Sequence, residues 1–241
     1  MRKYILLVTA IFLDVASGSP KCHAGNIYLQ TPAALNPGDH FRFVFVTDGA
    51  YTAKSTNISD YDKIVNDEAN SLNNATYNGV NLTWQVIAST PSVSARDHIG
   101  QSLTDQVFLV TGERVAFNTT LSGLWSGTIL HPINSTLTQS NLHIFGERAW
   151  SGSISTGAIN GGLGGPIVAT GTIEDSDSRW TSNRAFSPLN GATHRLYAIS
   201  NEITLSSNTV PEPSTLVGGT LGVIICALAA FARKSKTPPT P

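Results

Sequence analysis

Cysteine is almost absent from this chain of 241 residues. The two cysteines, Cys22 and Cys226, lie near the two ends of the sequence, and none lies between them. The central part therefore forms no disulfide and offers no thiolate to a metal ion. A hydrophobic core alone must stabilise it. About 185 residues suffice for this, because domains near that size bury about 70% of the surface of the unfolded chain.

Positive charge is scarce in the same central part. Residues 25–209 contain nine Lys and Arg against 14 Asp and Glu, because six of the 15 basic residues lie in the terminal segments. The central part thus carries a net charge of −5, whereas the whole chain carries −1. Since nucleic-acid-binding domains present a basic face, the composition predicts no nucleic-acid partner.

Motifs of known catalytic and metal sites are also missing. The histidines after residue 24 show no metal-ligand spacing, and no Gly-x-Ser-x-Gly supplies a nucleophile; they are His40, His98, His131, His143 and His194. Arg96, Asp97 and His98 are adjacent, but neighbours in a chain seldom face one another. A structural ion pair made by Arg96 or Asp97 is therefore favoured over catalysis. We expect a protein that is not an enzyme and has no cofactor.

Two alternatives depend on carboxylates. Glu174, Asp175 and Asp177 lie among hydroxyl side chains, a composition that Ca²⁺ could use, although a solvated acidic turn is the favoured interpretation. A secreted hydrolase could use Glu113, Glu147 or Asp175, which would require two carboxylates about 5–10 Å apart.

The central part combines one helix pattern with many strand patterns. Tyr61, Ile64, Val65, Ala69 and Leu72 recur at helical spacing. Ser59 with Asp62 predicts a capping box at the start of this helix. Segment 42–47 predicts a strand that ends at the Asp-Gly turn 48–49. Further strands are predicted at 82–88, 107–110, 114–117, 142–145, 167–172 and 195–205. The predicted fold class is α+β: a single, mostly β, irregular domain with one or two helices.

Glycine and tryptophan mark the irregular middle of this domain. The glycine-rich segment 152–165 lacks the Lys-Ser/Thr of a phosphate loop, so a flexible or tightly turned surface loop is expected. Trp84, Trp125, Trp150 and Trp180 are expected to anchor the core, because each aromatic ring buries on the order of 200 Å². Alternatively, Trp125, Trp150 and Trp180 form a stacking surface for a sugar. The five Asn-x-Ser/Thr sequons are attributed to composition; they begin at Asn57, Asn74, Asn81, Asn118 and Asn134.

The two ends of the chain carry apolar segments. Arg2 and Lys3 precede the apolar run 4–13, which is typical of a secretory signal peptide, and cleavage after Ala24 gives a signal of residues 1–24. At the other end, 17 uncharged residues, 216–232, reach the lower limit for a transmembrane helix. Arg233, Lys234 and Lys236 follow and predict a cytoplasmic C-terminus.

A short motif precedes this span: Val210, Pro211, Glu212, Pro213, Ser214 and Thr215. The motif, the short span and the basic cluster together resemble the PEP-CTERM sorting signal of Gram-negative bacteria over 210–236, within an expected sorting tag of 210–241. The resemblance implies recognition by exosortase, an integral-membrane cysteine-protease-like enzyme, at Pro211, Glu212 and Pro213. It also implies export, with a membrane anchor before processing and then a surface or exopolysaccharide-associated location.

The domain 25–209 has a resemblance of its own. Its elements come in this order: an early strand and helix, a middle rich in Trp and Gly, and a final strand containing Tyr197. This order is similar to that of the C-type-lectin and endostatin-like superfold. No Glu-Pro-Asn, Gln-Pro-Asp or Trp-Asn-Asp motif is present, so carbohydrate binding is not implied. We expect an exported envelope or extracellular-matrix protein with a binding or structural role. The alternatives are a lectin-like module for carbohydrate or calcium and, less favoured, a secreted hydrolase.

Overall fold

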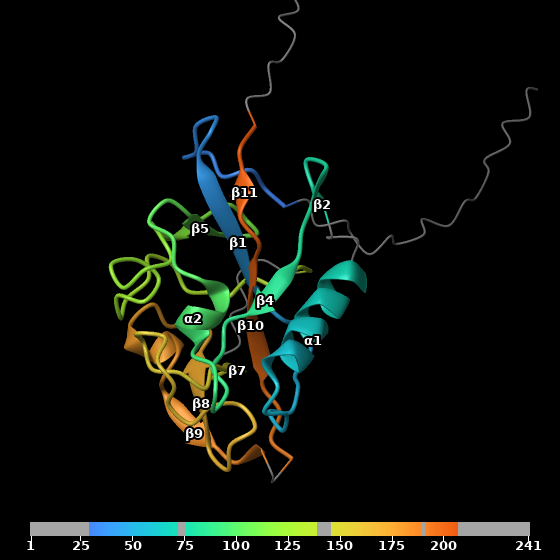
Figure 1. The fold of residues 1–241 in the computed structure, drawn as a ribbon, viewed down its shortest axis with the longest axis vertical. Helices are drawn as coiled ribbons and strands as arrows, with labels where there is room; N and C mark the ends of the chain where they lie inside the picture. Colours follow the sequence, from blue (N-terminus) through green and yellow to red (C-terminus); the bar gives the residue numbers. More distant parts are fainter. Residues whose placement is uncertain (1–28, 72–75, 139–145, 189–190, 207–241) are drawn as a thin grey trace, which may run out of the picture.

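The computed structural model of the protein describes residues 29–71, 76–138, 146–188 and 191–206. Over these residues the chain forms a mostly β domain with two α-helices and a short 3-10 helix (Figure 1). The α+β fold class predicted from the sequence is confirmed at this level. The expected signal peptide, sorting motif and transmembrane helix lie outside the described residues. No described helix is both long and apolar enough to cross a bilayer.

A central sheet organises the domain. Its strands follow the order β6-β5-β1-β10-β7-β8-β9, while β11 pairs with β1 and β4 pairs with β10. These strands are β1 (His40–Val46), β4 (Trp84–Val86), β5 (Gln106–Leu109), β6 (Arg114–Ala116), β7 (Arg148–Trp150), β8 (Val168–Thr172), β9 (Arg184–Phe186), β10 (Arg195–Ser200) and β11 (Ile203–Thr204). β1 and β10 are antiparallel neighbours, so the start and the end of the domain meet in the middle of the sheet.

Both faces of β1 are buried. Phe41, Phe43 and Phe45 belong to one hydrophobic cluster, whereas Val44 and Val46 belong to a second. Successive side chains of a strand point to opposite faces of the sheet. The sheet therefore separates two cores, and each is covered by the segments that connect the strands.

Helix α1 (Ile58–Ser71) covers the face that carries the phenylalanines (Figure 1). It buries Tyr61, Val65 and Ala69, which confirms the helical spacing predicted from the sequence. Burial of this stripe against the first cluster stabilises the helix more than its intrinsic propensity does.

The predicted capping box of α1 is wrong. The helix begins before Ser59, and Asn57 Oδ1 accepts the Ser59 N–H at 3.3 Å. Asp62 does not bond back to the start of the helix. Its carboxylate instead accepts the N–H of Val86 in β4 at 2.8 Å, so it joins helix to sheet.

Several short elements were not predicted from the sequence: helix α2, the β2–β3 hairpin, β7, β9 and the 3-10 helix. Helix α2 (Ala95–Ile99) has Ser94 as its N-cap: Ser94 Oγ accepts the Asp97 N–H at 3.2 Å and donates to the Asp97 carboxylate at 2.6 Å. A hairpin joins β2 (Thr76–Tyr77) to β3 (Val80–Asn81). Its two turn residues, Asn78 and Gly79, both have positive φ, as two-residue hairpins of this kind require.

Strands lie at the predicted places among the described residues, but their bounds differ. β1 begins two residues earlier than predicted, β5 is shifted by one residue, and the others are shorter. Segment 82–88 contains only the three residues of β4, and 195–205 divides into β10 and β11. The predicted strand 195–205 is interrupted at Asn201, which bonds to Thr83. The Asn201 N–H donates to the Thr83 carbonyl, and Asn201 Oδ1 accepts the Thr83 N–H, each at 2.8 Å. The strand predicted at 142–145 lies outside the described residues.

The glycine-rich segment 152–165 is tightly turned, as one of the two alternatives predicted, but it is partly buried and not wholly a surface loop. Leu163 is fully buried, and its N–H donates to the Ser89 carbonyl at 2.7 Å. A Cβ on Gly162 would lie 2.5 Å from the carbonyl carbon of Thr90. Glycine therefore permits a close approach of two backbones at this position.

Candidate functional site

The tryptophans named as a possible stacking surface are core residues. Trp125 is 1% exposed, and Trp150 and Trp180 are 0% exposed. The rings of Trp125 and Trp180 stack with centres 5.7 Å apart, and Trp150 Nε1 donates to the Tyr51 carbonyl at 2.7 Å. Because a ring without an exposed face cannot stack on a sugar, that alternative does not hold. Their expected role as core anchors is confirmed.

The acidic turn that includes Glu174, Asp175 and Asp177 is organised around an arginine. Asp177 caps the 3-10 helix Ser178–Trp180 and accepts the N–H and Nε–H of Arg179 at 2.9 and 3.0 Å. These bonds hold the pKa of the Asp177 carboxyl below its usual value. Asp175 lies 3.2 Å from Arg179 Nη2. In the described part of the chain, no three acidic, His or Cys side chains form a group that could hold a metal ion.

The adjacent residues Arg96, Asp97 and His98 separate on α2. His98 Nε2 lies 2.9 Å from Asp62 Oδ1, whereas the carboxylate of Asp97 is bonded to Ser94. The predicted ion pair of Arg96 or Asp97 is thus wrong for the described residues, because His98 is the residue that contacts a carboxylate, that of Asp62 on α1. The pair links the two helices and is structural.

The carboxylates considered for hydrolysis each have a separate partner. Glu113 accepts the hydroxyl of Thr111 in the turn between β5 and β6. Glu147 Oε2 lies 3.1 Å from Arg195 Nε. With Asp175 held by Arg179, no contact among the described residues joins any two of these three carboxylates.

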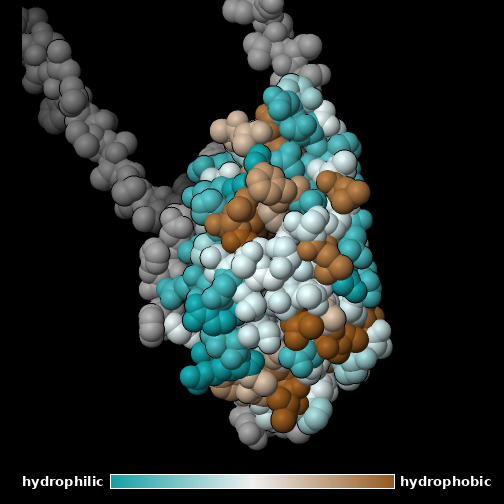
Figure 2. All heavy atoms as spheres, turned by 90° about the vertical axis from the view of Figure 1, so that its left-hand side faces the viewer, coloured by the Kyte–Doolittle hydropathy of each residue, from teal (hydrophilic) through white to brown (hydrophobic). Residues whose placement is uncertain are grey.

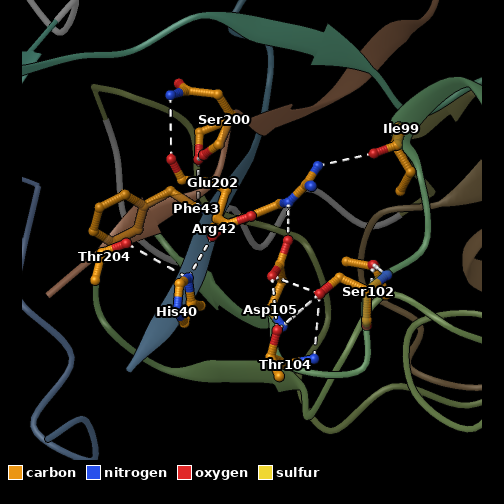
Figure 3. Close-up of polar contacts among 12 residues, drawn as sticks. His40, Arg42, Phe43, Ile99, Ser102, Thr104, Asp105, Ser200, Glu202 and Thr204 are labelled. Carbon is orange, nitrogen blue, oxygen red and sulfur yellow. Dashed lines mark hydrogen bonds and ion pairs between the residues drawn. The ribbon is translucent and has the colours of Figure 1, made fainter. Parts of the chain in front are cut away.

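A buried ion pair joins β1 to the segment before β5 (Figure 3). Arg42 donates from Nε to Asp105 Oδ2 and from Nη1 to the Ile99 carbonyl, each at 2.8 Å. Asp105 Oδ1 accepts the Ser102 hydroxyl at 2.6 Å. His40 and Glu202 form a second, exposed pair nearby. The buried pair is structural. It also holds Ser102, whose N–H donates to Thr119 at the start of the loop after β6.

A small groove of about 150 Å³ opens beside β6. It combines four apolar residues, three hydroxyl side chains and a glycine: Val115, Ala116, Phe117, Leu130, Ser122, Ser126, Thr128 and Gly123. We call it the Phe117 groove, because the Phe117 ring is 56% exposed. The green-to-yellow segment after β6 lies on the left of Figure 1. Figure 2 shows that side, where apolar residues emerge in separate groups between polar ones.

Arg114 holds the exposed ring in place. Its guanidinium carbon lies 4.9 Å from the centre of the Phe117 ring and 5.3 Å from the centre of the Phe108 ring. Phe108 is buried, so this cation–π stack connects the exposed ring to the core. Arg114 makes no ion pair with any carboxylate of the described residues. A positive charge without a carboxylate partner among the described residues therefore lies against the Phe117 ring, although Arg114 is not one of the residues that line the groove.

The loop that forms the groove is held at its start. Asn118 Oδ1 accepts the N–H and the hydroxyl of Thr120, at 3.0 and 2.7 Å. A Cβ on Gly123 would lie 2.3 Å from both oxygens of Asn118, so only glycine fits there. Thr119 Oγ1 accepts the Ser102 N–H at 2.7 Å, which attaches the loop to the buried ion pair.

The loop is also held at its end. The Leu130 N–H donates to the Val115 carbonyl at 2.8 Å, so the returning chain covers the outer edge of β6. Because the chain comes back to β6 here, Thr128 and Leu130 line the groove together with the exposed Phe117. The sequence predicted Phe117 at the end of a strand. No local sequence pattern predicted that residues 128–131 return to β6.

No family model matches the chain, and no curated protein matches it.

Proposed function

We propose that this protein is an exported bacterial envelope protein that exosortase sorts to the cell surface or extracellular matrix. The order of features at 210–241 carries the proposal: the Pro-Glu-Pro motif, an uncharged span and a basic cluster. A signal peptide at 1–24 would start export, and the span 216–232 would hold the chain in the membrane until it is processed.

The proposed role of the domain is binding, not catalysis. The Phe117 groove supports this role, because it presents an exposed aromatic ring and hydroxyls on a rigidly held loop. The likeness to the C-type-lectin fold remains part of the proposal. The early strand β1 and helix α1, the irregular middle and the final strand β10 with Tyr197 support it.

Expression in hosts with and without exosortase tests the sorting. The proposal expects that the wild-type chain loses mass at its C-terminus and leaves the cell membrane only in the host that has the enzyme. Replacing Pro211, Glu212 and Pro213 by Ala should abolish both changes. The matched control, Pro238→Ala with Pro239→Ala, changes two prolines outside the motif and should process normally. Identical mass and location in both hosts would refute the proposal.

A further inference from the structure

The Phe117 groove has the size of a single sugar ring. Its volume of about 150 Å³ corresponds to about five water molecules at about 30 Å³ each. Sites for drug-sized ligands are larger, about 300–1,000 Å³. The groove can thus take one ring or one side chain, while the rest of a longer ligand would run over the surface.

The lining of the groove is amphipathic in the same way as a sugar ring. Phe117 and Leu130 offer exposed apolar surface, 56% and 50% respectively. Ser126 donates its hydroxyl to the Thr128 carbonyl at 2.7 Å, and its oxygen accepts the Thr128 N–H at 3.4 Å. Because a hydroxyl oxygen has two lone pairs, one remains to accept a hydrogen bond from a ligand. A pyranose has C–H faces that suit an aromatic ring and hydroxyls around its rim that suit such acceptors.

The positive charge of Arg114 favours an acidic sugar over a neutral one as the ligand. The domain is acidic overall, yet the cation beside the groove, Arg114, has no carboxylate partner among the described residues. The His131 ring contacts the backbone of the same residue, with Nδ1 2.8 Å from the Arg114 carbonyl oxygen. A guanidinium bonds carboxylates with good geometry and strength. A ligand whose carboxylate lies on the Arg114 side of the Phe117 ring is therefore complemented better than a neutral one.

We propose that the Phe117 groove binds a carboxylated sugar residue of an acidic polysaccharide, with the ring against Phe117 and the carboxylate toward Arg114. The proposal names the ligand class for the binding role above and rests on it. Its test measures binding by the purified chain, so it fails independently of the sorting experiment.

The test uses the full-length protein in a sugar-free polyoxyethylene detergent. Isothermal titration calorimetry compares a glucuronate-containing tetrasaccharide with its carboxyl-reduced, neutral form. The neutral form should bind about tenfold more weakly, the equivalent of about 1.4 kcal/mol. Phe117→Ala should weaken the acidic ligand by about tenfold or more, whereas Phe117→Trp should keep binding, because it retains an aromatic face.

Matched controls separate the groove from general surface effects. Ile167 is 57% exposed and does not line the groove, so Ile167→Ala should bind as the wild type does. Arg114→Gln should remove the preference for the acidic sugar, whereas Arg184→Gln, at an exposed arginine of β9, should not. Failure of the wild type to bind the acidic tetrasaccharide would overturn the proposal. So would equal affinity for both sugars, or full binding by a folded Phe117→Ala variant.

Discussion

Asp105 accepts the guanidinium Nε–H of Arg42 at 2.8 Å while its own side chain is 1% exposed. The same carboxylate accepts the hydroxyl of Ser102, whose N–H is bonded to Thr119 at the start of the groove loop. One buried acid thus connects the central strand β1 to the loop that carries the candidate site.

Removing this charge should destabilise the domain. We expect Asp105→Asn to lower the free energy of unfolding by about 3 kcal/mol, because Arg42 is then left buried without its counter-ion. Urea denaturation followed by circular dichroism measures this. The control is Glu202→Gln, which breaks the exposed pair with His40 and should cost under about 1 kcal/mol. Equal losses in the two variants would mean that the buried pair has no special role.

Gly171 should be intolerant of any side chain. A Cβ there would lie 1.6 Å from the Trp180 carbonyl oxygen, so β8 and the 3-10 helix would have to separate. Gly171→Ala should cost several kcal/mol or prevent folding. Gly79→Ala adds a Cβ into open space at φ +80° and should cost only the strain of that conformation, about 1 kcal/mol. Melting temperatures of the two variants provide the comparison, and a mild Gly171→Ala would contradict the packing described.

The burial of all four tryptophans has a spectroscopic consequence. Trp84, Trp125, Trp150 and Trp180 are at most 1% exposed, so acrylamide should quench the native fluorescence weakly. Quenching should rise strongly in urea, when the rings reach solvent. Addition of a ligand to the groove should change neither value, because the groove contains no tryptophan. Strong quenching of the native protein would show that at least one ring is accessible.

Stability should fall at alkaline pH in a way that depends on Tyr61. Burial raises the pKa of the Tyr61 phenol from about 10 to about 12, and its hydroxyl donates to the Ser55 carbonyl at 2.8 Å. Between these pH values the unfolded chain has lost a proton that the folded chain keeps, so the free energy of unfolding decreases as pH rises. The contribution of Tyr61 is complete below pH 10.

Tyr61→Phe removes that proton. Urea denaturation at pH 8 sets the baseline, and repeats at pH 10 to 12 should show a smaller decrease in the variant than in the wild type. Tyr51 and Tyr197 also have raised pKa values because they are buried, so some decrease should remain in the variant. Identical decreases would contradict the shift assigned to Tyr61.

Local periodicity predicted the parts of the fold that depend on local spacing. Tyr61, Val65 and Ala69 repeat over several helical turns, and β1 alternates residues that suit two buried faces, so both elements follow from the sequence. Helix α2 has only five residues, too few for a period to appear. The N-cap residue Ser94 was nevertheless a usable signal, as was the Asn78-Gly79 turn of the hairpin.

The candidate site depended on contacts that are remote in sequence. The partner of Asp62 is His98, and the bond that closes the groove joins Val115 to Leu130. Tryptophan composition suggested a stacking surface, but the packing of Trp125 on Trp180 places those rings inside. Among the described residues, the large exposed aromatic side chain is that of Phe117, whose surroundings are decided by the path of the loop that follows it.

The most direct test of the account is mass spectrometry of the terminal peptides of the mature protein, recovered from the surface or matrix fraction of cells that contain exosortase. The account predicts an N-terminus at Gly25, after the signal peptide, and a C-terminus within 210–215 that lacks the span. Recovery of the intact chain from inside the cell, with both terminal segments still attached, would contradict it.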